Sequence, residues 1–170
     1  NIIVEINADG HIGKLRTDTK EYDHHVGCLL PAPVNAHSHS FQYAMAGMAE
    51  LHEITPNQND FWSWRNAMYD LALTINPDQL EDIATMLYKE MLRNGYTHVA
   101  EFHYLHHDIS GKKFNNISEN GERLVSAAKK AGIKITLIPI FYQMGGFGKD
   151  PLPEFVKSIK LAKKFKNVEI

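Results

Sequence analysis

Two histidines separated by one residue, His37 and His39, are the side chains in this chain best suited to chemistry. They directly follow Pro33-Val34-Asn35-Ala36, and the whole stretch is typical of a short β-strand. Because side chains alternate along a strand, both imidazoles would lie on one face, where a single metal ion could accept them. Imidazole suits zinc but also iron, nickel and copper, so the pair predicts a metal site without identifying the metal. The alternative is a pair of loop histidines.

The composition restricts the class of protein and its partners. The chain has 170 residues, 44% of them hydrophobic, and a formal net charge of -2, so it can bury a core and has no overall positive field for nucleic acid. Cys28 is the single cysteine, which excludes an internal disulfide and fits a reducing compartment. The first residues lack the features of a signal peptide, and no stretch has the ~20 apolar residues of a membrane helix. We therefore expect a cytoplasmic protein without a membrane partner.

The hydrophobic pattern predicts strands that alternate with helices around the histidine pair. We expect a β-hairpin within 1–30, strands at 34–39, 96–104 and 133–141, a loop-and-helix insertion at 41–74, and helices at 77–94, 119–131 and 153–166. Near-continuous apolar strands between helices favour a parallel sheet, and active sites of parallel barrels lie at the carboxyl ends of the strands. The predicted fold class is α/β: about the first three βα units of a partial (β/α)8 TIM-type barrel, preceded by a small β segment. A complete small doubly wound domain is the alternative.

Several segments in collinear order, from about Leu30 to Gly148, resemble the amidohydrolase superfamily and, within it, the formiminoglutamate deiminases. These segments are 30–39, 41–50, 61–65 with Met68-Tyr69, 101–107 and 142–148. The resemblance implies that 1–30 is part of a small β-sandwich domain and that 31–170 is the first part of a hydrolase barrel, incomplete at its C-terminus. It also implies hydrolysis of N-formimino-L-glutamate to N-formyl-L-glutamate and ammonia, a step of histidine degradation, with one zinc ion.

The same resemblance implies roles for individual residues. His37 and His39 would bind the metal, and Gln42, Arg65 and Tyr104 would line the pocket of a small substrate that carries carboxylates. A guanidinium can hold a carboxylate through two parallel hydrogen bonds, which makes Arg65 the best candidate for that contact. Without the resemblance, these three residues would be interpreted as a polar residue in a turn, a surface arginine and a packed tyrosine.

Other polar residues near the predicted strand ends have simpler interpretations. Glu101 and His103 share one face of the strand at 96–104, and we expect them to satisfy one another's hydrogen bonds inside the barrel mouth, although a role in orienting a ligand or in acid–base chemistry is open. The loop residues 106–108 are expected to be exposed, although a role in supporting the residues of the site is open, and the histidines at 24–25 are expected at the surface. The glycine-rich loop at 145–149 lacks the spacing of a phosphate-binding loop and is expected at the active-site face.

Two imidazoles fill half of a four-coordinate zinc shell, so this chain by itself is expected to be inactive. The resemblance places a third metal-binding histidine, a further histidine and an aspartate after Ile170, where the catalytic residues are expected, and it implies a homodimer for the full-length protein. Two other functions are open. The chain could belong to an aminohydrolase of the same superfamily that acts on a cyclic amidine such as guanine or an s-triazine, or it could be a non-catalytic α/β module.

Overall fold

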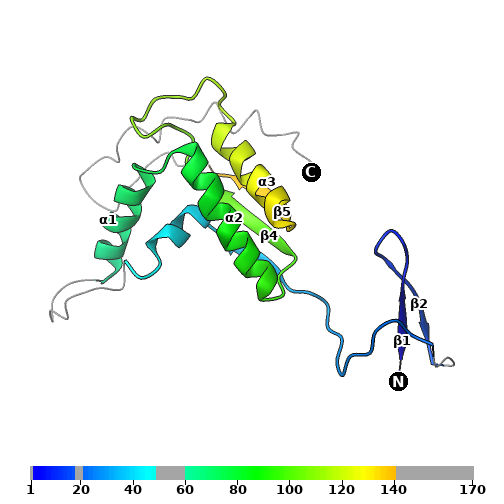
Figure 1. Cartoon of the computed structure of the whole chain (residues 1–170). Coiled ribbons are helices and arrows are strands. Elements are labelled where there is room, and N and C mark those ends of the chain that lie inside the picture. Colours follow the sequence, from blue (N-terminus) through cyan, green and yellow to red (C-terminus); the bar gives the residue numbers. More distant parts are fainter. Residues whose placement is uncertain (1, 18–20, 49–59, 141–170) are drawn as a thin grey trace. The chain divides into compact units, whose positions relative to one another are not determined.

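The structure is a computed structural model that describes residues 2–17, 21–48 and 60–140, drawn in colour in Figure 1. The chain divides into two compact units, Asn1–Pro31 and Ala32–Ile170. In the first unit, β1 (Ile3–Ile6) and β2 (Ile12–Arg16) form an antiparallel hairpin, which confirms the predicted hairpin. A two-stranded sheet cannot bury a core by itself, and Ile6, Ile12 and Leu15 are exposed.

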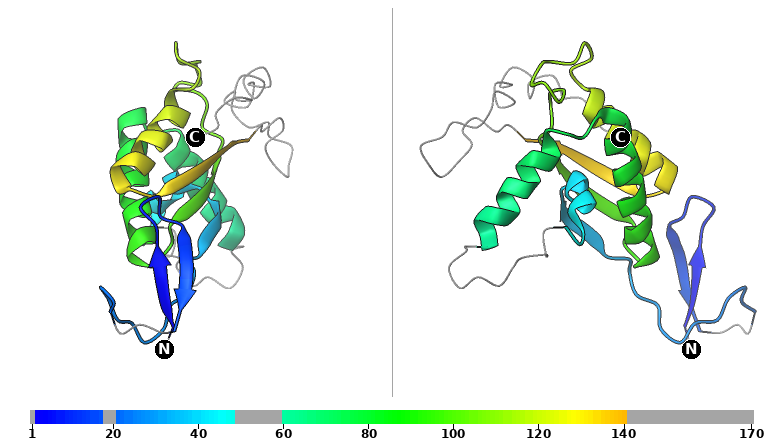
Figure 2. Two further views of the ribbon diagram at one scale, coloured as in Figure 1. Left: turned by 90° about the vertical axis from the view of Figure 1, so that its right-hand side faces the viewer. Right: turned by 60° about the vertical axis from the view of Figure 1, so that its left-hand side comes forward.

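The second unit is built on a parallel sheet of three strands in the order β3-β4-β5. These strands are β3 (Val34–Ser38), β4 (His98–His103) and β5 (Lys134–Pro139). The segment between β3 and β4 contains the short 3-10 helix η1 (Ser40–Met45) and the helices α1 (Asp60–Ala72) and α2 (Pro77–Arg93), and α3 (Glu119–Ala131) connects β4 to β5. Figure 2 shows α2 and α3 side by side on one face of the sheet. The α/β class and the parallel sheet are confirmed.

Local signals determine where the two covering helices begin and end. The side chain of Asn76 accepts a hydrogen bond from the backbone N–H of Gln79 at 2.9 Å, and the Gln79 side chain accepts one from the N–H of Asn76 at 3.0 Å. This capping box precedes Pro77, whose ring suits the first position of a helix. The second covering helix, α3, ends before Gly132, whose φ of 88° is a left-handed conformation that favours glycine.

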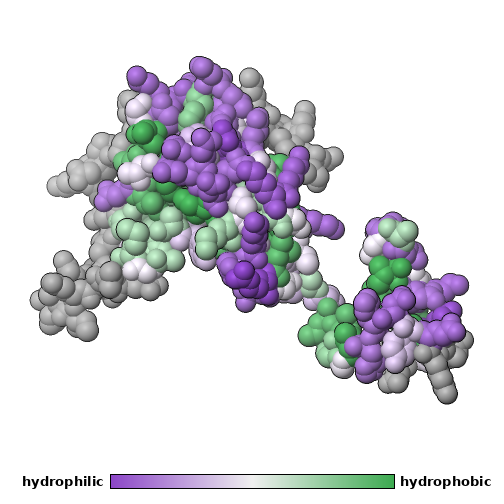
Figure 3. Space-filling model, viewed as in Figure 1, coloured by the Kyte–Doolittle hydropathy of each residue, from purple (hydrophilic) through white to green (hydrophobic). Residues whose placement is uncertain are grey.

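The core lies between the sheet and these helices. Along β4, the side chains of Val99, Glu101 and His103 are buried, and the alternate residues are only partly buried. Val99 belongs to a cluster of buried residues from α2, α3 and their flanks, which includes Leu80, Ala84, Tyr88, Met91, Leu124, Ala127 and Ala128. Figure 3 shows mainly hydrophilic side chains over the outer surface of α2 and α3, as expected for amphipathic helices.

Some predictions concern residues outside the described ranges. The helix at 153–166 and the glycine-rich loop at 145–149 lie there, as does the middle of the insertion at 41–74, residues 49–59. The described strands are shorter than predicted, because β3 ends at Ser38 and β4 at His103. Among the helices that the structure describes, none is long and apolar enough to cross a lipid bilayer.

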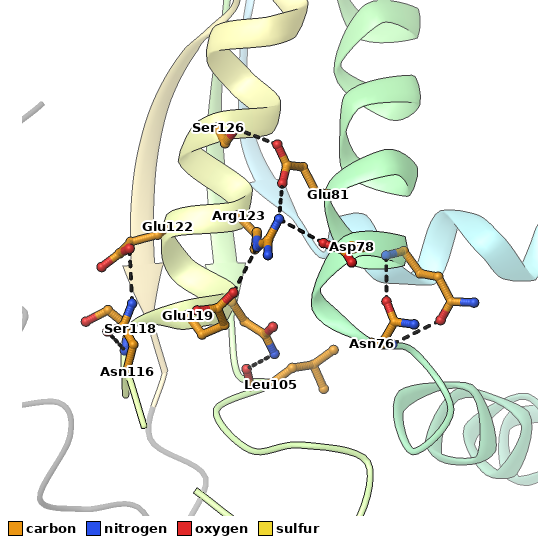
Figure 4. Close-up of polar contacts among 12 residues, drawn as sticks. Asn76, Asp78, Glu81, Leu105, Asn116, Ser118, Glu119, Glu122, Arg123 and Ser126 are labelled. Carbon is orange, nitrogen blue, oxygen red and sulfur yellow. Dashed lines mark hydrogen bonds and ion pairs between the residues drawn. The ribbon is translucent and has the colours of Figure 1, made fainter. Parts of the chain in front are cut away.

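A buried carboxylate joins α2 to α3. Glu81 is 5% exposed, and its carboxylate accepts hydrogen bonds from Lys130 Nζ at 2.8 Å, from Ser126 Oγ and from Arg123 Nη1 at 2.9 Å. Figure 4 shows Glu81 between Ser126 and Arg123. The hydrogen bonds of Lys130, Ser126 and Arg123 lower the pKa of Glu81 from 4.5 to about 2, although burial acts in the opposite direction.

This depressed pKa predicts a pH-dependent contribution to stability. A carboxyl group with a lower pKa in the folded state stabilises the fold above its unfolded pKa of 4.5, and the contribution is lost as the pH falls toward about 2. Because Lys130 and Arg123 are 57% and 34% exposed, solvent screens the interaction, and we expect about 2 kcal/mol at pH 7.

Urea unfolding of the full protein at pH 7 and pH 3 checks this expectation. Glu81→Gln should lower the free energy of unfolding at pH 7, and the difference from the wild type should be much smaller at pH 3. The control is Asp82→Asn, at the exposed neighbouring position of the same helix. An effect of Glu81→Gln that is equally large at both pH values would contradict the assignment.

Candidate functional site

The structure brings the two imidazoles of the histidine pair together at the carboxyl end of β3. The Nε2 atoms of His37 and His39 are 3.0 Å apart, and the rings meet edge to face with centroids separated by 4.7 Å. His37 is in β3, whereas His39 already precedes η1 as its N-cap residue. The β3–β4 register also shifts between Asn35 and Ser38. The convergence therefore depends on this turn as well as on the alternation of a regular strand.

Phe102 in the neighbouring strand β4 supports both rings. Its carbonyl oxygen lies 2.9 Å from His39 Nδ1, and because a carbonyl can only accept, Nδ1 carries the proton. This tautomer leaves the lone pair on Nε2 of His39, the atom that faces His37. The Phe102 ring packs on the His37 ring with centroids 4.3 Å apart. One residue of β4 thus orients one imidazole through its backbone and packs against the other.

This arrangement fits a metal ion of the kind that imidazoles bind. Two nitrogens bound to one tetrahedral zinc ion at about 2.0–2.1 Å are roughly 3.3 Å apart, which is close to the observed 3.0 Å between His37 and His39. A backbone carbonyl that holds the second ring nitrogen is the usual support for such a ligand. Within the described residues, no group of three or more His, Cys, Asp or Glu side chains could hold a metal ion, so the histidine pair by itself would leave such a site incomplete.

Gln42 and Tyr104, two of the predicted substrate-binding residues, are in contact with each other beside the histidine pair. Gln42 Nε2 donates to the Tyr104 hydroxyl at 3.0 Å, and the Tyr104 ring lies edge to face against His39 with centroids 5.1 Å apart. Both polar groups also contact the sulfur of Met68, Gln42 Nε2 at 3.2 Å and the Tyr104 hydroxyl at 3.6 Å. The structure therefore places these two residues next to the histidine pair.

Arg65 lies in α1, and its side chain is outside the described part of the structure. Its backbone position is three residues before Met68, which is one turn of the same helix, and residues at that spacing share a helix face. Since Met68 contacts Gln42 and Tyr104, α1 is the element that reaches this side of the histidine pair.

The prediction for Glu101 and His103 was wrong about their surroundings. They do share one face of β4, but that face packs against the helices. Glu101 Oε1 accepts a hydrogen bond from the backbone N–H of Ser40 at 2.6 Å, and the His103 ring lies 4.6 Å from the ring of His106. Burial lowers the pKa of His103 well below its usual value, and the neighbouring His106 lowers it further. A strand with polar residues on both faces does not reveal which face the helices will cover.

The expected exposure of the loop at 106–108 is also wrong: His107 and Asp108 are half-buried, and His106 is buried. His106 is 7% exposed, and its Nε2 lies 2.9 Å from the carbonyl oxygen of Ile140. Burial lowers its pKa, against the effect of that hydrogen bond. His24 and His25 are exposed, as predicted.

Three contributors to this region were not predicted from the sequence: Ser40, Met68 and Phe102. Ser40 acts through its backbone N–H and Phe102 through its carbonyl as well as its ring, and no sequence pattern indicates a contact made by a backbone group, which every residue type carries. Met68 is a buried residue of α1, and its spacing of three residues from Arg65 is the one signal that could have been used.

Residues 28–168 match the amidohydrolase family over most of the chain. The chain belongs to the amidohydrolase family. This family assignment confirms the resemblance to the amidohydrolase superfamily that the motifs around the histidine pair predicted.

This amidohydrolase chain is 45% identical over 157 residues to the formimidoylglutamate deiminase of Pseudomonas aeruginosa. The match covers 91% of the chain and 34% of that protein, so the chain spans about a third of the length of this relative. The fold is also similar to the crystal structure of an amidohydrolase from Brucella melitensis, with a TM-score of 0.73 and 38% identity over 96% of this chain and 39% of the other.

A more distant structure shares the fold of this amidohydrolase chain. It is an atrazine chlorohydrolase from Arthrobacter aurescens complexed with zinc, with a TM-score of 0.52 and 22% identity over 71% of this chain and 26% of that one.

Proposed function

We propose that the full protein hydrolyses N-formimino-L-glutamate to N-formyl-L-glutamate and ammonia, and that this chain supplies the first part of its site. The similarity to a formimidoylglutamate deiminase supports the choice of substrate. The observation that carries the proposal is the convergence of His37 and His39, with Nε2 atoms 3.0 Å apart, beside the contact between Gln42 and Tyr104.

We propose further that the parallel strands β3, β4 and β5 are the first three strands of a (β/α)8 barrel. Their order follows the chain, and α2 and α3 cover one face, as the outer helices of such a barrel do. The histidine pair lies at the carboxyl ends of the strands, where barrel enzymes build their sites. Residues 1–30 would then be part of a small β-sandwich, and 31–170 the first part of the barrel.

His37 and His39 would hold one zinc ion, and the remaining ligands and the catalytic groups would come from the protein after Ile170. When bound, zinc lowers the pKa of a water molecule and polarises the bond under attack. The chain's own contribution is orientation, because the Phe102 carbonyl holds the proton of His39 on Nδ1.

Gln42 and Tyr104 are placed to bind the polar end of a substrate. The Gln42 amide and the Tyr104 hydroxyl both contact the Met68 sulfur, which is a weak acceptor. A carboxylate or an imino group of the substrate would replace these weak contacts with stronger hydrogen bonds. Arg65 would bind a substrate carboxylate from the neighbouring helix α1.

Ammonia release from N-formimino-L-glutamate by the full protein tests this proposal. We expect Arg65→Ala to lower kcat/KM about 100-fold, mainly through KM, because a charge-assisted pair with the substrate is lost. The control is Arg93→Ala, an arginine on α2 with a side chain that is 74% exposed and paired with Glu90.

Equal activity of the two arginine variants would count against a dicarboxylate substrate. Ammonia release from guanine but none from N-formimino-L-glutamate would instead support the cyclic amidine alternative.

A further inference from the structure

Behind the histidine pair, on the face of the sheet that packs against the helices, lies a buried carboxylate. Glu101 is 2% exposed, and its neighbours Ser40 and Tyr88 are 0% exposed. Burial raises the pKa of Tyr88, and the nearby charge of Glu101 raises it further. Burying a charge costs free energy unless strong hydrogen bonds stabilise it, so the contacts of this carboxylate indicate its structural role.

Within the described residues, the carboxylate makes one hydrogen bond, to the backbone. Glu101 Oε1 accepts from the N–H of Ser40 at 2.6 Å, a short bond of the charge-assisted kind. The other oxygen, Oε2, has no partner with hydrogen-bond geometry in the described part of the chain, and neither has the Tyr88 hydroxyl or Ser40 Oγ. The Ser40 backbone N–H is therefore the hydrogen-bond donor of this carboxylate that the described residues provide, while Tyr88 interacts with it electrostatically.

Ser40 is the residue that immediately follows His39. It opens η1, and His39 precedes that helix without a side-chain hydrogen bond that would cap it. The Glu101 carboxylate takes over this function by binding the first N–H of the helix. Because the peptide between His39 and Ser40 is planar, holding the Ser40 nitrogen restricts the position and direction of the His39 backbone.

Two consecutive residues of β4 thus restrain His39, one through its backbone carbonyl and the other through its side chain. Phe102 accepts the hydrogen bond of the imidazole, and Glu101 binds the peptide that follows. Strand pairing alone does not hold this turn, because the β3–β4 register shifts just before it, between Asn35 and Ser38.

We propose that Glu101 is a positioning residue for metal binding, which acts on His39 through the backbone of Ser40. The inference rests on the proposed metal site at His37 and His39. The proposal depends on the length of the Glu101 side chain, because the carboxylate must reach the Ser40 nitrogen for the two imidazole nitrogens to face each other.

Two substitutions of Glu101 separate the effect of side-chain length from that of the negative charge, and both keep a polar group in the buried site. Glu101→Gln keeps the length and an acceptor oxygen but removes the charge. Glu101→Asp keeps the charge but is one methylene shorter and falls short of the Ser40 N–H. Tyr88→Phe is the matched control, since it removes a hydroxyl from the same cluster without touching that hydrogen bond.

The measurement is zinc affinity of the full, metal-stripped protein, obtained by competition with a coloured chelator. We expect Glu101→Asp to weaken zinc binding about 10–100-fold, the range seen when the support of a metal ligand is removed. Glu101→Gln and Tyr88→Phe should bind zinc as the wild type does. A merely structural role would lower the melting temperature of the metal-free protein and leave zinc affinity unchanged.

Three results would overturn the inference: an aspartate variant that binds zinc normally, a glutamine variant weakened as much as the aspartate variant, or an equal loss in Tyr88→Phe. A wild-type protein that binds no zinc would instead remove the metal site on which the proposed function rests, so the two failures are distinguishable.

Discussion

His39→Ala is expected to lower kcat/KM for ammonia release about a thousandfold or more. The substitution removes one of the two Nε2 atoms that lie 3.0 Å apart, and with it the support from the Phe102 carbonyl. A bound metal ion contributes several kcal/mol to stabilising the transition state, and each 1.36 kcal/mol corresponds to about a factor of ten in rate. Steady-state kinetics, together with the zinc content of the purified protein, measures this loss.

The matched control is another histidine of the same sheet. His98 begins β4 at the opposite end of the strand, where its Nε2 lies 2.8 Å from Thr136 Oγ1. We expect His98→Ala to keep zinc and most of the activity, because residues at the amino ends of barrel strands contribute to stability, whereas the active site lies at the carboxyl ends. If His39→Ala retained both zinc and activity, the histidine pair would not be a metal site.

Leu124→Ala is expected to lower the free energy of unfolding by about 3–4 kcal/mol. Leu124 is 1% exposed and belongs to the core cluster between α3, α2 and the sheet. Removing a large buried side chain loses the favourable free energy of its burial and leaves a cavity that the neighbouring residues fill only in part. Urea unfolding of the full protein, with fluorescence and circular dichroism as independent probes, gives the difference.

The control for this substitution is Met86→Ala on α2. Met86 is 59% exposed, so its truncation should change the free energy of unfolding by less than about 0.5 kcal/mol. Similar losses for Leu124→Ala and Met86→Ala would show that the space between α2 and α3 is not a tightly packed core.

The elements that depend on neighbouring residues could be predicted from the sequence. Asn76 before Pro77 and the left-handed Gly132 set helix ends, and the helices predicted at 77–94 and 119–131 agree with α2 and α3. The parallel sheet followed from apolar strands that alternate with helices, and it is confirmed. The closeness of His37 and His39 also followed from their spacing, although a turn after β3 completes it.

Contacts between distant segments could not be predicted in this way. The pattern of β4 shows that Glu101 and Phe102 point to opposite faces, but it does not show which face the helices cover. The predicted environment of Glu101 was therefore wrong, and the part that Phe102 plays beside the histidines was missed. The burial of His106 depends in the same way on residues 34 positions away, at Ile140.

By itself, then, the sequence determined the helix ends and the closeness of the two imidazoles at the end of β3, because each depends on residues close together in the chain, and the alternation of strands with helices indicated the parallel sheet. Only the tertiary structure decided that α2 and α3 cover the Glu101 face of β4, which leaves Phe102 with the histidines. The physical reason is that burial is a property of the packed layers, whereas the alternation of a strand fixes only which side chains share a face.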